Sequence, residues 1–275
     1  MLEVVAIATC FNRREMTVAA VQSIEKQFET IENATVRFVV VDDASTDGTA
    51  AALEEMNSVE LIHGTGEYYW GGGMSVAAAA IGLADMVLWF NDDIELNEGA
   101  VAAMLVTSAR NRGAIVVGCI SHPKSDEPTY GGYFVNAAPF RLSFELAPVG
   151  TELEVHTFNG NMVLFPADVH ANLRGPDPSF THHYGDFDMG LRARQENVKI
   201  VTCPEYVGKT ERNSTDGTFR DPSVTRRRRL KLLLGPKGFP IKERRTYLRR
   251  HAGWTWLAQW VGFYFVWIAR ICFRR

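Results

Sequence analysis

Short runs of consecutive apolar residues alternate with segments of helical periodicity over the first part of the chain. Such runs predict strands buried on both faces, because a strand with one face in water would alternate apolar and polar residues. The predicted strands lie at 3–9, 36–41, 59–62 and 86–90, and the predicted helices end near 27 or span 49–56, 74–84 and 98–111. This alternation is typical of an α/β fold with a parallel sheet and right-handed crossovers.

The pattern becomes less regular after residue 114. Strands are expected at 114–120, 130–135, 153–158 and 161–165, followed by an amphipathic helix at 186–197 and a last strand at 198–202. No internal repeat or low-complexity segment interrupts the sequence. We therefore predict one catalytic-type domain over 1–219 and a C-terminal extension over 220–275.

Polar residues mark the starts of the first two helices. Asn12 is followed three positions later by Glu15, the spacing of a capping box. Residues 45–49 read STDGT, which is turn chemistry. The first signal predicts the start of the helix that ends near Gln27, and the second predicts a turn leading into the helix at 49–56.

The charge of the chain is strongly divided. The 275 residues have a formal net charge of −3, but the extension holds fifteen Lys and Arg against only Asp221 and Glu243. The extension therefore carries +13 and the rest of the chain −16. This division indicates that the extension has a different partner from the acidic body.

The extension contains an aromatic, apolar segment of sixteen residues, 254–269, with four tryptophans and arginines on both sides. A membrane-spanning helix needs about 20 apolar residues, so the segment is short for that role. Tryptophans between basic flanks instead favour a helix lying in the interface of an anionic membrane. The alternative is a helix docked on the protein's own core or in a homodimer interface. Nucleic acid is not favoured as a partner, because no nucleic-acid-binding motif accompanies the basic run.

The cysteines Cys10, Cys119, Cys203 and Cys272 lie far apart and form no CxxC pair. This spacing argues against a zinc site and against a disulfide framework. The first apolar run is short and has no basic residues before it, so we expect a strand rather than a signal peptide. Both observations favour a cytoplasmic protein, and the segment at 254–269 would make it peripheral at the inner face of the cell membrane.

Carboxylates directly follow two of the predicted strands. Asp42 and Asp43 follow the second strand, and Asn91, Asp92 and Asp93 follow the fourth. Ligands bind at the carboxyl edge of an α/β sheet, and adjacent carboxylates need a cation there, so we expect Mg²⁺ or Mn²⁺ carrying a phosphate. Alternatively, these acids could cap the helices that follow. An acid after the second strand could also accept hydrogen bonds from a ribose or a base.

Two glycine-containing segments are further candidates. Trp70 precedes Gly71, Gly72 and Gly73, which either let the backbone approach a ligand or form a flexible loop. Residues 158–161 read FNGN before an apolar strand and could line an acceptor cleft.

Acidic and basic residues cluster at the start of the helix expected at 186–197. Asp188 and Arg192 are four residues apart and would pair on one helix face. Asp186 would then be free to act as a general base. His182 and His183 stand beside it, as a solvated pair or, alternatively, as a metal or phosphate contact.

The chemistry suggested by these acids leaves several protein classes to compare. A Rossmann-type dehydrogenase would need GxGxxG after the first strand, whereas residues 9–13 read TCFNR. A nucleotidyltransferase also combines an α/β sheet with acidic metal ligands. A non-catalytic sugar-nucleotide-binding protein at the membrane is the other alternative.

Four motifs, in order, resemble glycosyltransferase family 2. Residues 5–13 (VAIATCFNR) resemble its opening strand, and residues 39–49 (VVVDDASTDGT) resemble its second-strand signature. Residues 91–93 (NDD) are similar to its DxD motif, and residues 185–194 (GDFDMGLRAR) to its catalytic-base helix. The resemblance implies a GT-A fold, a nucleotide-diphosphate sugar donor, a divalent metal and inversion at the anomeric carbon.

The resemblance also implies roles for individual residues. Asp186 would take the proton of the acceptor hydroxyl, and Asp93 would bind the metal directly. Many members have a metal-binding His after the last strand, whereas Lys209 or Arg212 would neutralise the diphosphate here. The remaining residues would hold the nucleotide, the diphosphate or the sugar: Thr9, Phe11, Asn12, Arg13, Asp42, Asp43, Trp70, Gly71, Gly72, Gly73, Met74, Asn91 and Asp92.

The motif spacing resembles that of bacterial envelope enzymes. The sequence therefore predicts a hexosyl- or deoxyhexosyltransferase that extends a glycan or a lipid-linked acceptor in cell-envelope polysaccharide synthesis.

Overall fold

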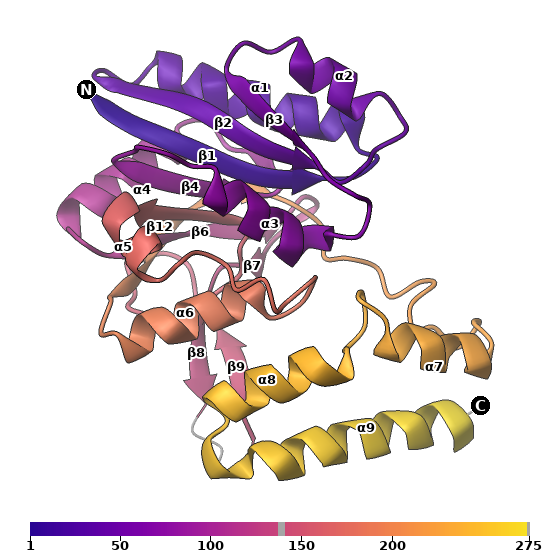
Figure 1. The fold of residues 1–275 in the computed structure, drawn as a ribbon. Helices are drawn as coiled ribbons and strands as arrows, with labels where there is room; N and C mark the ends of the chain where they lie inside the picture. The colour runs from indigo at the N-terminus through magenta and orange to yellow at the C-terminus, as the bar shows by residue number, and fades with distance from the viewer. Residues whose placement is uncertain (137–140, 274–275) are drawn as a thin grey trace.

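The structure, a computed structural model, describes residues 1–136 and 141–273, and it confirms the α/β fold (Figure 1). One sheet of nine strands has the order β3-β2-β1-β4-β11-β6-β12-β5, and β7 pairs with β6 outside this path. A smaller sheet has the order β10-β8-β9. The strands are β1 Leu2–Cys10, β2 Ala34–Asp42, β3 Val59–His63, β4 Met86–Phe90, β5 Glu95–Leu96, β6 Ile115–His122, β7 Ser125–Tyr130, β8 Gly132–Asn136, β9 Ser143–Leu146, β10 Thr157–Phe158, β11 Met162–Pro166 and β12 Ile200–Lys209.

The predicted parallel pairing holds only for part of the sheet. Strands β3, β2, β1 and β4 are parallel, as are β6 and β12. β11 lies antiparallel between β4 and β6, in the part of the chain where the sequence pattern is less regular. Because of this insertion, Met162 at the start of β11 pairs with Phe90 at the end of β4. The FNGN loop therefore reaches the same sheet edge as Asn91, whose N–H donates to the carbonyl of Asn161 at 2.8 Å.

Helices cover both faces of the large sheet. They are α1 Arg14–Glu29, α2 Thr49–Glu54, α3 Tyr69–Ala79, α4 Ala100–Arg110, α5 Ala167–Asn172, α6 Gly185–Gln195, α7 Arg226–Leu234, α8 Ile241–His251 and α9 Trp256–Phe273, with a 3₁₀ turn at Gly253–Thr255. Val4, Ala6 and Ala8 of β1 pack in the layer with α1, α2 and α4. Val5 and Ile7 pack in the layer with α3, α5 and α6. Two buried faces explain why the strand is continuously apolar.

Two helix starts differ from the prediction. The residue before α1 is Arg13, which makes no side-chain capping bond, so the capping box at Asn12 was wrong. Helix α3 begins at Tyr69 rather than 74 and includes all three glycines, so the loop prediction for 71–73 was also wrong.

The glycines of α3 are required by close packing. A Cβ atom at Gly71 would collide with the carbonyl oxygen of Phe180, and one at Gly73 with the hydroxyl of Thr9. Glycine costs about 1 kcal/mol relative to alanine inside a helix. Local propensity therefore argues against a helix here, whereas contact with β1 and with the chain before α6 demands small residues.

The strands after residue 120 also differ from those expected. The strand predicted at 130–135 is divided between β7 and β8, and the one at 153–158 is reduced to β10 and a single bridge at Glu154. β12 continues beyond 202 to Lys209, with register shifts against β6. These segments pair across the small sheet or at irregular positions, which periodicity alone does not reveal.

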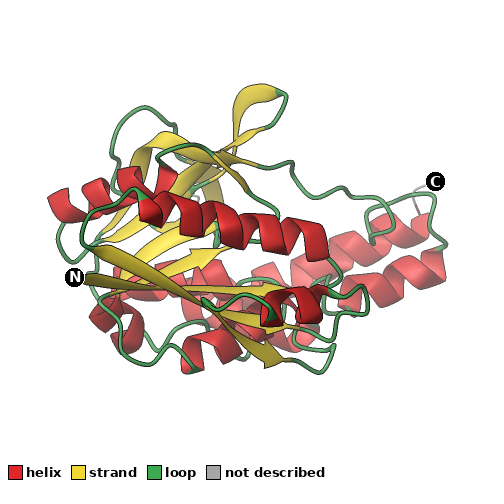
Figure 2. Cartoon of the chain, turned by 90° about the horizontal axis from the view of Figure 1, so that it is seen from above, coloured by secondary structure: helices red, strands yellow, loops and turns green. Residues whose placement is uncertain are grey.

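The C-terminal extension is helical, as expected, and its helices α7, α8 and α9 project beyond one end of the large sheet (Figures 1 and 2). Tyr247 and Leu248 of α8 pack with Phe180 and Leu191, next to and on α6. Ile271 of α9 packs with residues of α7 and the chain before it. The extension is thus joined to the sheet-containing body through α6.

Candidate active site

The carboxyl ends of β1, β2 and β4 meet at one edge of the sheet. Cys10 pairs with Asp42 across β1 and β2, and β4 lies on the other side of β1. The residues that follow these strands are therefore brought together, as the sequence predicts. The same edge receives the loop before β11 and the start of α6.

Asp42 and Asp43 are both buried, with exposed fractions of 2% and 4%. Asp42 accepts hydrogen bonds from the N–H of Ser45 and from the thiol of Cys10. The two oxygens of Asp43 accept from the N–H groups of Gly66 and Tyr69, at 2.8 and 2.9 Å. Neither acid caps α2, so the capping alternative was wrong for this pair. Asp43 instead fixes the loop that leads into α3, and contact of either acid with ribose or base stays a prediction.

The chain after β1 is held by its own polar groups. Asn12 has φ +52°, and its side-chain oxygen accepts from the N–H of Thr46 at 2.7 Å. Its backbone N–H donates to the hydroxyl of Ser45. Phe11 is 50% exposed beside it, and Thr9 lies against Gly73 of α3. Asn12 thus shapes the site edge, and Phe11 is accessible to a ligand.

Arg13 joins the two acids that follow β4. Its Nη1 lies 2.8 Å from Oδ1 of Asp92 and 3.1 Å from Oδ2 of Asp93. Burial raises the pKa of Asp92, although the Arg13 guanidinium and the hydroxyl of Thr17 oppose this rise. Burial alone would lower the pKa of Arg13, but the two carboxylates raise it. Arg13 therefore provides part of the positive charge that adjacent acids were expected to need.

Asp93 retains one oxygen for another partner. Its Oδ1 is buried and has no hydrogen-bond partner among the described residues. Among residues 1–136 and 141–273, no group of three or more His, Cys, Asp or Glu side chains could hold a metal ion. Mg²⁺ is commonly bound through one or two carboxylates together with substrate phosphates. A single carboxylate with a free oxygen fits that arrangement, so Asp93 remains the candidate ligand for Mg²⁺ or Mn²⁺.

Trp70 connects α3 to the same acidic edge. Its indole N–H donates to Oδ1 of Asn91 at 2.8 Å, and its ring fills the space beside Gly160 and Gly185. Met74, also expected at the diphosphate, is fully buried in the apolar core instead. Trp70 thus lies between the acidic edge and the start of α6.

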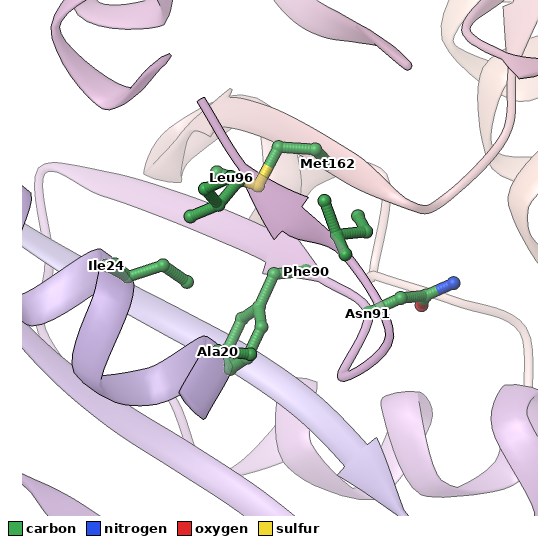
Figure 3. Close-up of a pocket in the computed structure, with 7 residues that line it drawn as sticks. Ala20, Ile24, Phe90, Asn91, Leu96 and Met162 are labelled. Atoms are coloured by element: carbon green, nitrogen blue, oxygen red, sulfur yellow. The ribbon is translucent and has the colours of Figure 1, made fainter. Parts of the chain in front are cut away.

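A small apolar pocket lies beside Asn91 but has no room for a water molecule (Figure 3). Its lining comes from α1, β4, β11 and the β5 region: Ala20, Ile24, Phe90, Asn91, Ile94, Leu96 and Met162. It is part of the core packing behind the site rather than a ligand cleft.

Asp186 lies in the first turn of α6, held at a fixed position. Its Oδ2 accepts from the N–H of Gly160 at 3.1 Å and from Nδ2 of Asn159 at 3.4 Å, and its Oδ1 accepts from the N–H of Phe187. Burial raises the pKa of Asp186 despite these hydrogen bonds. Oδ1 of Asn159 is buried without a partner among the described residues. A basic carboxylate thus stands beside an amide oxygen that can accept one more hydrogen bond.

Asp188 and Arg192 form the predicted ion pair, at 2.7 Å. The expectation of a solvated histidine pair was wrong. Burial lowers the pKa of His182 to about 3, and the His183 ring stacks on Phe239 with its Nε2 3.1 Å from the carbonyl of Lys237. His183 therefore packs against the C-terminal extension, whereas the His182 ring lies against Tyr69 at the start of α3.

Two tyrosines were not expected at the site. Burial raises the pKa of Tyr130, and the charges of Asp93 and Asp186 raise it further. Burial and Asp186 raise the pKa of Tyr133 to about 12. Their segment was predicted only as a strand, with no polar motif to mark it. Tyr130 thus lies within electrostatic reach of both acids.

Arg212 lies beside this tyrosine-lined part of the site. The N–H of Asn213 is 3.4 Å from the Tyr130 hydroxyl, and Arg212 lowers the pKa of Tyr130. Arg212 also borders an open hollow of about 320 Å³, lined by His122, Glu127, Pro128, Thr129, Glu211 and Arg212. Lys209 is the last residue of β12, and its role at a diphosphate stays a prediction.

Comparison with known proteins agrees with this fold. A mannosyltransferase from Pyrobaculum calidifontis, solved with GDP-Man and Mn²⁺, has a TM-score of 0.57 and 17% identity, over 90% of this chain and 64% of that chain. GalNAc-T7, solved with UDP, GalNAc and Mn²⁺, has a TM-score of 0.63 and 13% identity, over 85% of this chain and 47% of that chain. The chain thus spans less than two thirds of either protein. A search of curated proteins gave no match.

These structural likenesses show a shared fold, which confirms the expected GT-A architecture. The model of the family described as glycosyl transferase family 2 matches residues 5–172, more than half of the chain. This chain therefore belongs to glycosyl transferase family 2.

Proposed function

We propose that the protein is an inverting glycosyltransferase that moves a sugar from a nucleotide diphosphate to a hydroxyl of a glycan or lipid-linked acceptor. The observation that carries the proposal is a pair of unlike carboxylates in one site. Asp93 has a buried oxygen without a protein partner among the described residues, and Asp186 is a buried base. The loop before β11 joins the two acids, because the N–H of Gly160 donates to Asp186 and the carbonyl of Asn161 accepts from the N–H of Asn91, two residues before Asp93.

On the donor side, Asp93 would hold Mg²⁺ or Mn²⁺ together with the diphosphate. Such an ion neutralises the charge that develops on a leaving diphosphate. Arg13 lies between Asp92 and Asp93 and supplies a further positive charge there. Trp70, oriented by Asn91, borders the sugar position. The metal ion and Arg13 would favour departure of the nucleotide diphosphate.

On the acceptor side, Asp186 would take the proton of the attacking hydroxyl. Its raised pKa makes it a stronger base than an exposed aspartate, while the backbone N–H groups of Gly160 and Phe187 fix its orientation. The free oxygen of Asn159 would accept a hydrogen bond from the acceptor. Attack opposite to the departing diphosphate, in one displacement, inverts the anomeric carbon.

The test of donor binding is a thermal-shift panel of nucleotide sugars with and without Mn²⁺. At least one nucleoside diphosphate sugar is expected to raise the unfolding temperature, and more strongly with the metal, because a ligand that binds only the folded state stabilises it. No shift with any nucleoside diphosphate would exclude the proposal. Mass analysis of acceptor incubated with the stabilising donor then separates transfer of sugar from transfer of a nucleotide, and binding without either product indicates a non-catalytic protein.

We also propose that α9 docks on the inner face of an anionic cell membrane, where acceptors for cell-envelope polysaccharide are held. Leu257, Val261, Phe265 and Ile268 recur with helical spacing and are exposed, Phe265 at 73%. The 21 residues Gly253–Phe273 are also long and apolar enough to cross a membrane, by length and composition alone.

Positive charge accompanies this apolar face. Arg226, Arg227 and Arg228 are exposed on α7, and Arg245 and Arg249 are exposed on α8. An apolar face combined with basic residues favours adsorption to anionic lipid. The exposed arginines therefore support an interfacial helix.

Substituting both Val261 and Phe265 with Asp is expected to lower binding to phosphatidylglycerol-containing vesicles by about tenfold or more, because two apolar side chains are lost from the contact. The measurement is co-sedimentation, with pure phosphatidylcholine vesicles for comparison. Leu83→Asp is the matched control, since Leu83 is 89% exposed and lies after α3. Unchanged binding by the double variant would exclude membrane docking through this face. A dimer in size-exclusion chromatography that the double variant converts to a monomer would instead assign the face to a homodimer.

A further inference from the structure

Asp188 is a fully buried carboxylate held by three basic side chains. Its Oδ2 accepts from Nε of Arg192 at 2.7 Å, within α6. Its Oδ1 accepts from Nη1 of Arg250 at 2.6 Å and lies 2.8 Å from Nε2 of His251. Burial would raise the pKa of Asp188, but His251 and the two arginines lower it overall. Two of the three partners come from α8. The C-terminal extension therefore supplies two of the basic side chains that hold Asp188 on α6, the helix that also carries Asp186.

Helix α8 also holds the chain that leads into α6. Nη2 of Arg250 lies 2.9 Å from Oδ2 of Asp177. Glu243 accepts from the hydroxyl of Thr181 at 2.6 Å and from its N–H at 3.3 Å. The carbonyl of Thr181 in turn accepts from the N–H of Gly71 at 2.8 Å, at the start of α3. Contacts from α8 thus continue through this chain to the helix that carries Trp70.

The residue that begins α6 is held in a strained conformation. Tyr184 has φ +74°, in the left-handed region that bulky residues rarely adopt. Nη1 of Arg244 donates to its hydroxyl at 2.9 Å, and its ring stacks on Tyr247 at 4.5 Å between centroids. Strained residues persist when their surroundings fix them, and they concentrate at active sites. Here two residues of α8 fix the residue two positions before Asp186.

We propose that Arg250 and His251 are positioning residues for Asp186, which act through Asp188 and make α8 part of the catalytic unit. This inference rests on the proposed function and deepens it, because it assigns the orientation of the base to the C-terminal extension. Neither residue need touch the substrate. They fix the axis of α6, and with it the direction in which Asp186 faces the acceptor.

A small displacement of the base is enough to lower the rate. A misplacement of about 1 Å remote from the chemistry can cost about 100-fold in rate. The donor side would be affected less, because Asp93 and Arg13 are attached to β4 and the start of α1. Loss of the positioning contacts is therefore expected to lower kcat with little change in donor affinity. General destabilisation of the fold would not separate these two quantities.

The test uses the full-length chain with substitutions at Arg250. Arg250→Met is expected to lower kcat about 100-fold with the donor KM changed by less than about twofold. Arg250→Lys is expected to recover most of the lost rate, because a lysine can still pair with Asp188. His251→Leu is expected to lower kcat, and His251→Gln, which keeps a donor near the place of Nε2, to recover part of it. Lys242→Met is the matched control, since Lys242 is exposed on the same helix.

Transfer of sugar by the unsubstituted chain is measured first, which distinguishes failure of the proposed function from failure of the positioning role. If the unsubstituted chain transfers no sugar, the proposed function fails. If it does and Arg250→Met keeps its kcat, the positioning role is excluded. A loss of kcat and donor affinity in equal proportion, with no recovery in Arg250→Lys, would also exclude it and would assign the ion cluster to folding alone.

Discussion

Asp186→Asn is expected to lower kcat by about 10²–10⁴-fold, the usual contribution of a general base, while donor binding changes little. Asn is nearly the same size as Asp, and its single oxygen can still accept from the N–H of Gly160, whereas the N–H of Phe187, which donates to the other oxygen of Asp186, loses its acceptor. It cannot accept a proton from the acceptor hydroxyl. The loss should therefore appear in the chemical step rather than in the formation of the donor complex.

Single-turnover rates and donor thermal shifts together test this expectation. A general base works only when it is deprotonated, and burial raises the pKa of Asp186. The rate of the unsubstituted protein should therefore fall as the pH is lowered through that raised pKa, and the residual rate of Asp186→Asn should lack this limb. A donor shift that disappears together with the rate would remove Asp186 from the role of base.

Asp93→Asn is expected to abolish the extra stabilisation that Mn²⁺ gives to the donor complex and to lower turnover by about 10²–10³-fold. Asp93 is the acid with a buried oxygen that lacks a partner among the described residues, whereas Asp92 is already engaged by Arg13 and Thr17. An amide oxygen is a weaker ligand than a carboxylate for a hard cation. Removing the charge also weakens the ion pair with Arg13, so the donor shift without metal reports that separate effect.

The measurement is a Mn²⁺ titration of the thermal shift at a fixed concentration of donor. Glu95→Gln is the control, because it removes a negative charge from an exposed side chain two residues away. If Asp93→Asn responds to Mn²⁺ as the unsubstituted protein does, Asp93 is not the metal ligand.

Much of the fold was predictable from local sequence. The strand at 86–90 was predicted at its observed bounds, because five consecutive apolar residues end at a polar turn. The start of α3 was not predictable, since its glycines oppose a helix locally and are required only by contacts with Phe180 and Thr9. The antiparallel position of β11 was equally hidden, because an apolar run carries no information about strand direction.

The candidate site, like the fold, was predictable only in part. The family motifs placed Asp93 and Asp186 on the right elements, because each motif follows a strand or opens a helix. Tyr130 had no such motif, and it joins the site through the pairing of β7 with β6. The charge of the C-terminal extension predicted a different partner from that of the body, and it did not reveal that Glu243, Arg244 and Arg250 contact the body directly.

The sequence by itself determined the α/β order of elements, the acids at the strand ends and the family, because these depend on periodicity and on neighbours along the chain. Only the tertiary structure decided which basic side chains pair with these acids. Arg13 binds Asp92 across 79 residues, and Arg250 binds Asp188 across 62. Such contacts depend on which side chains share a buried, weakly screened environment, where a charge requires a partner. That environment exists only after the sheet and α8 have assembled.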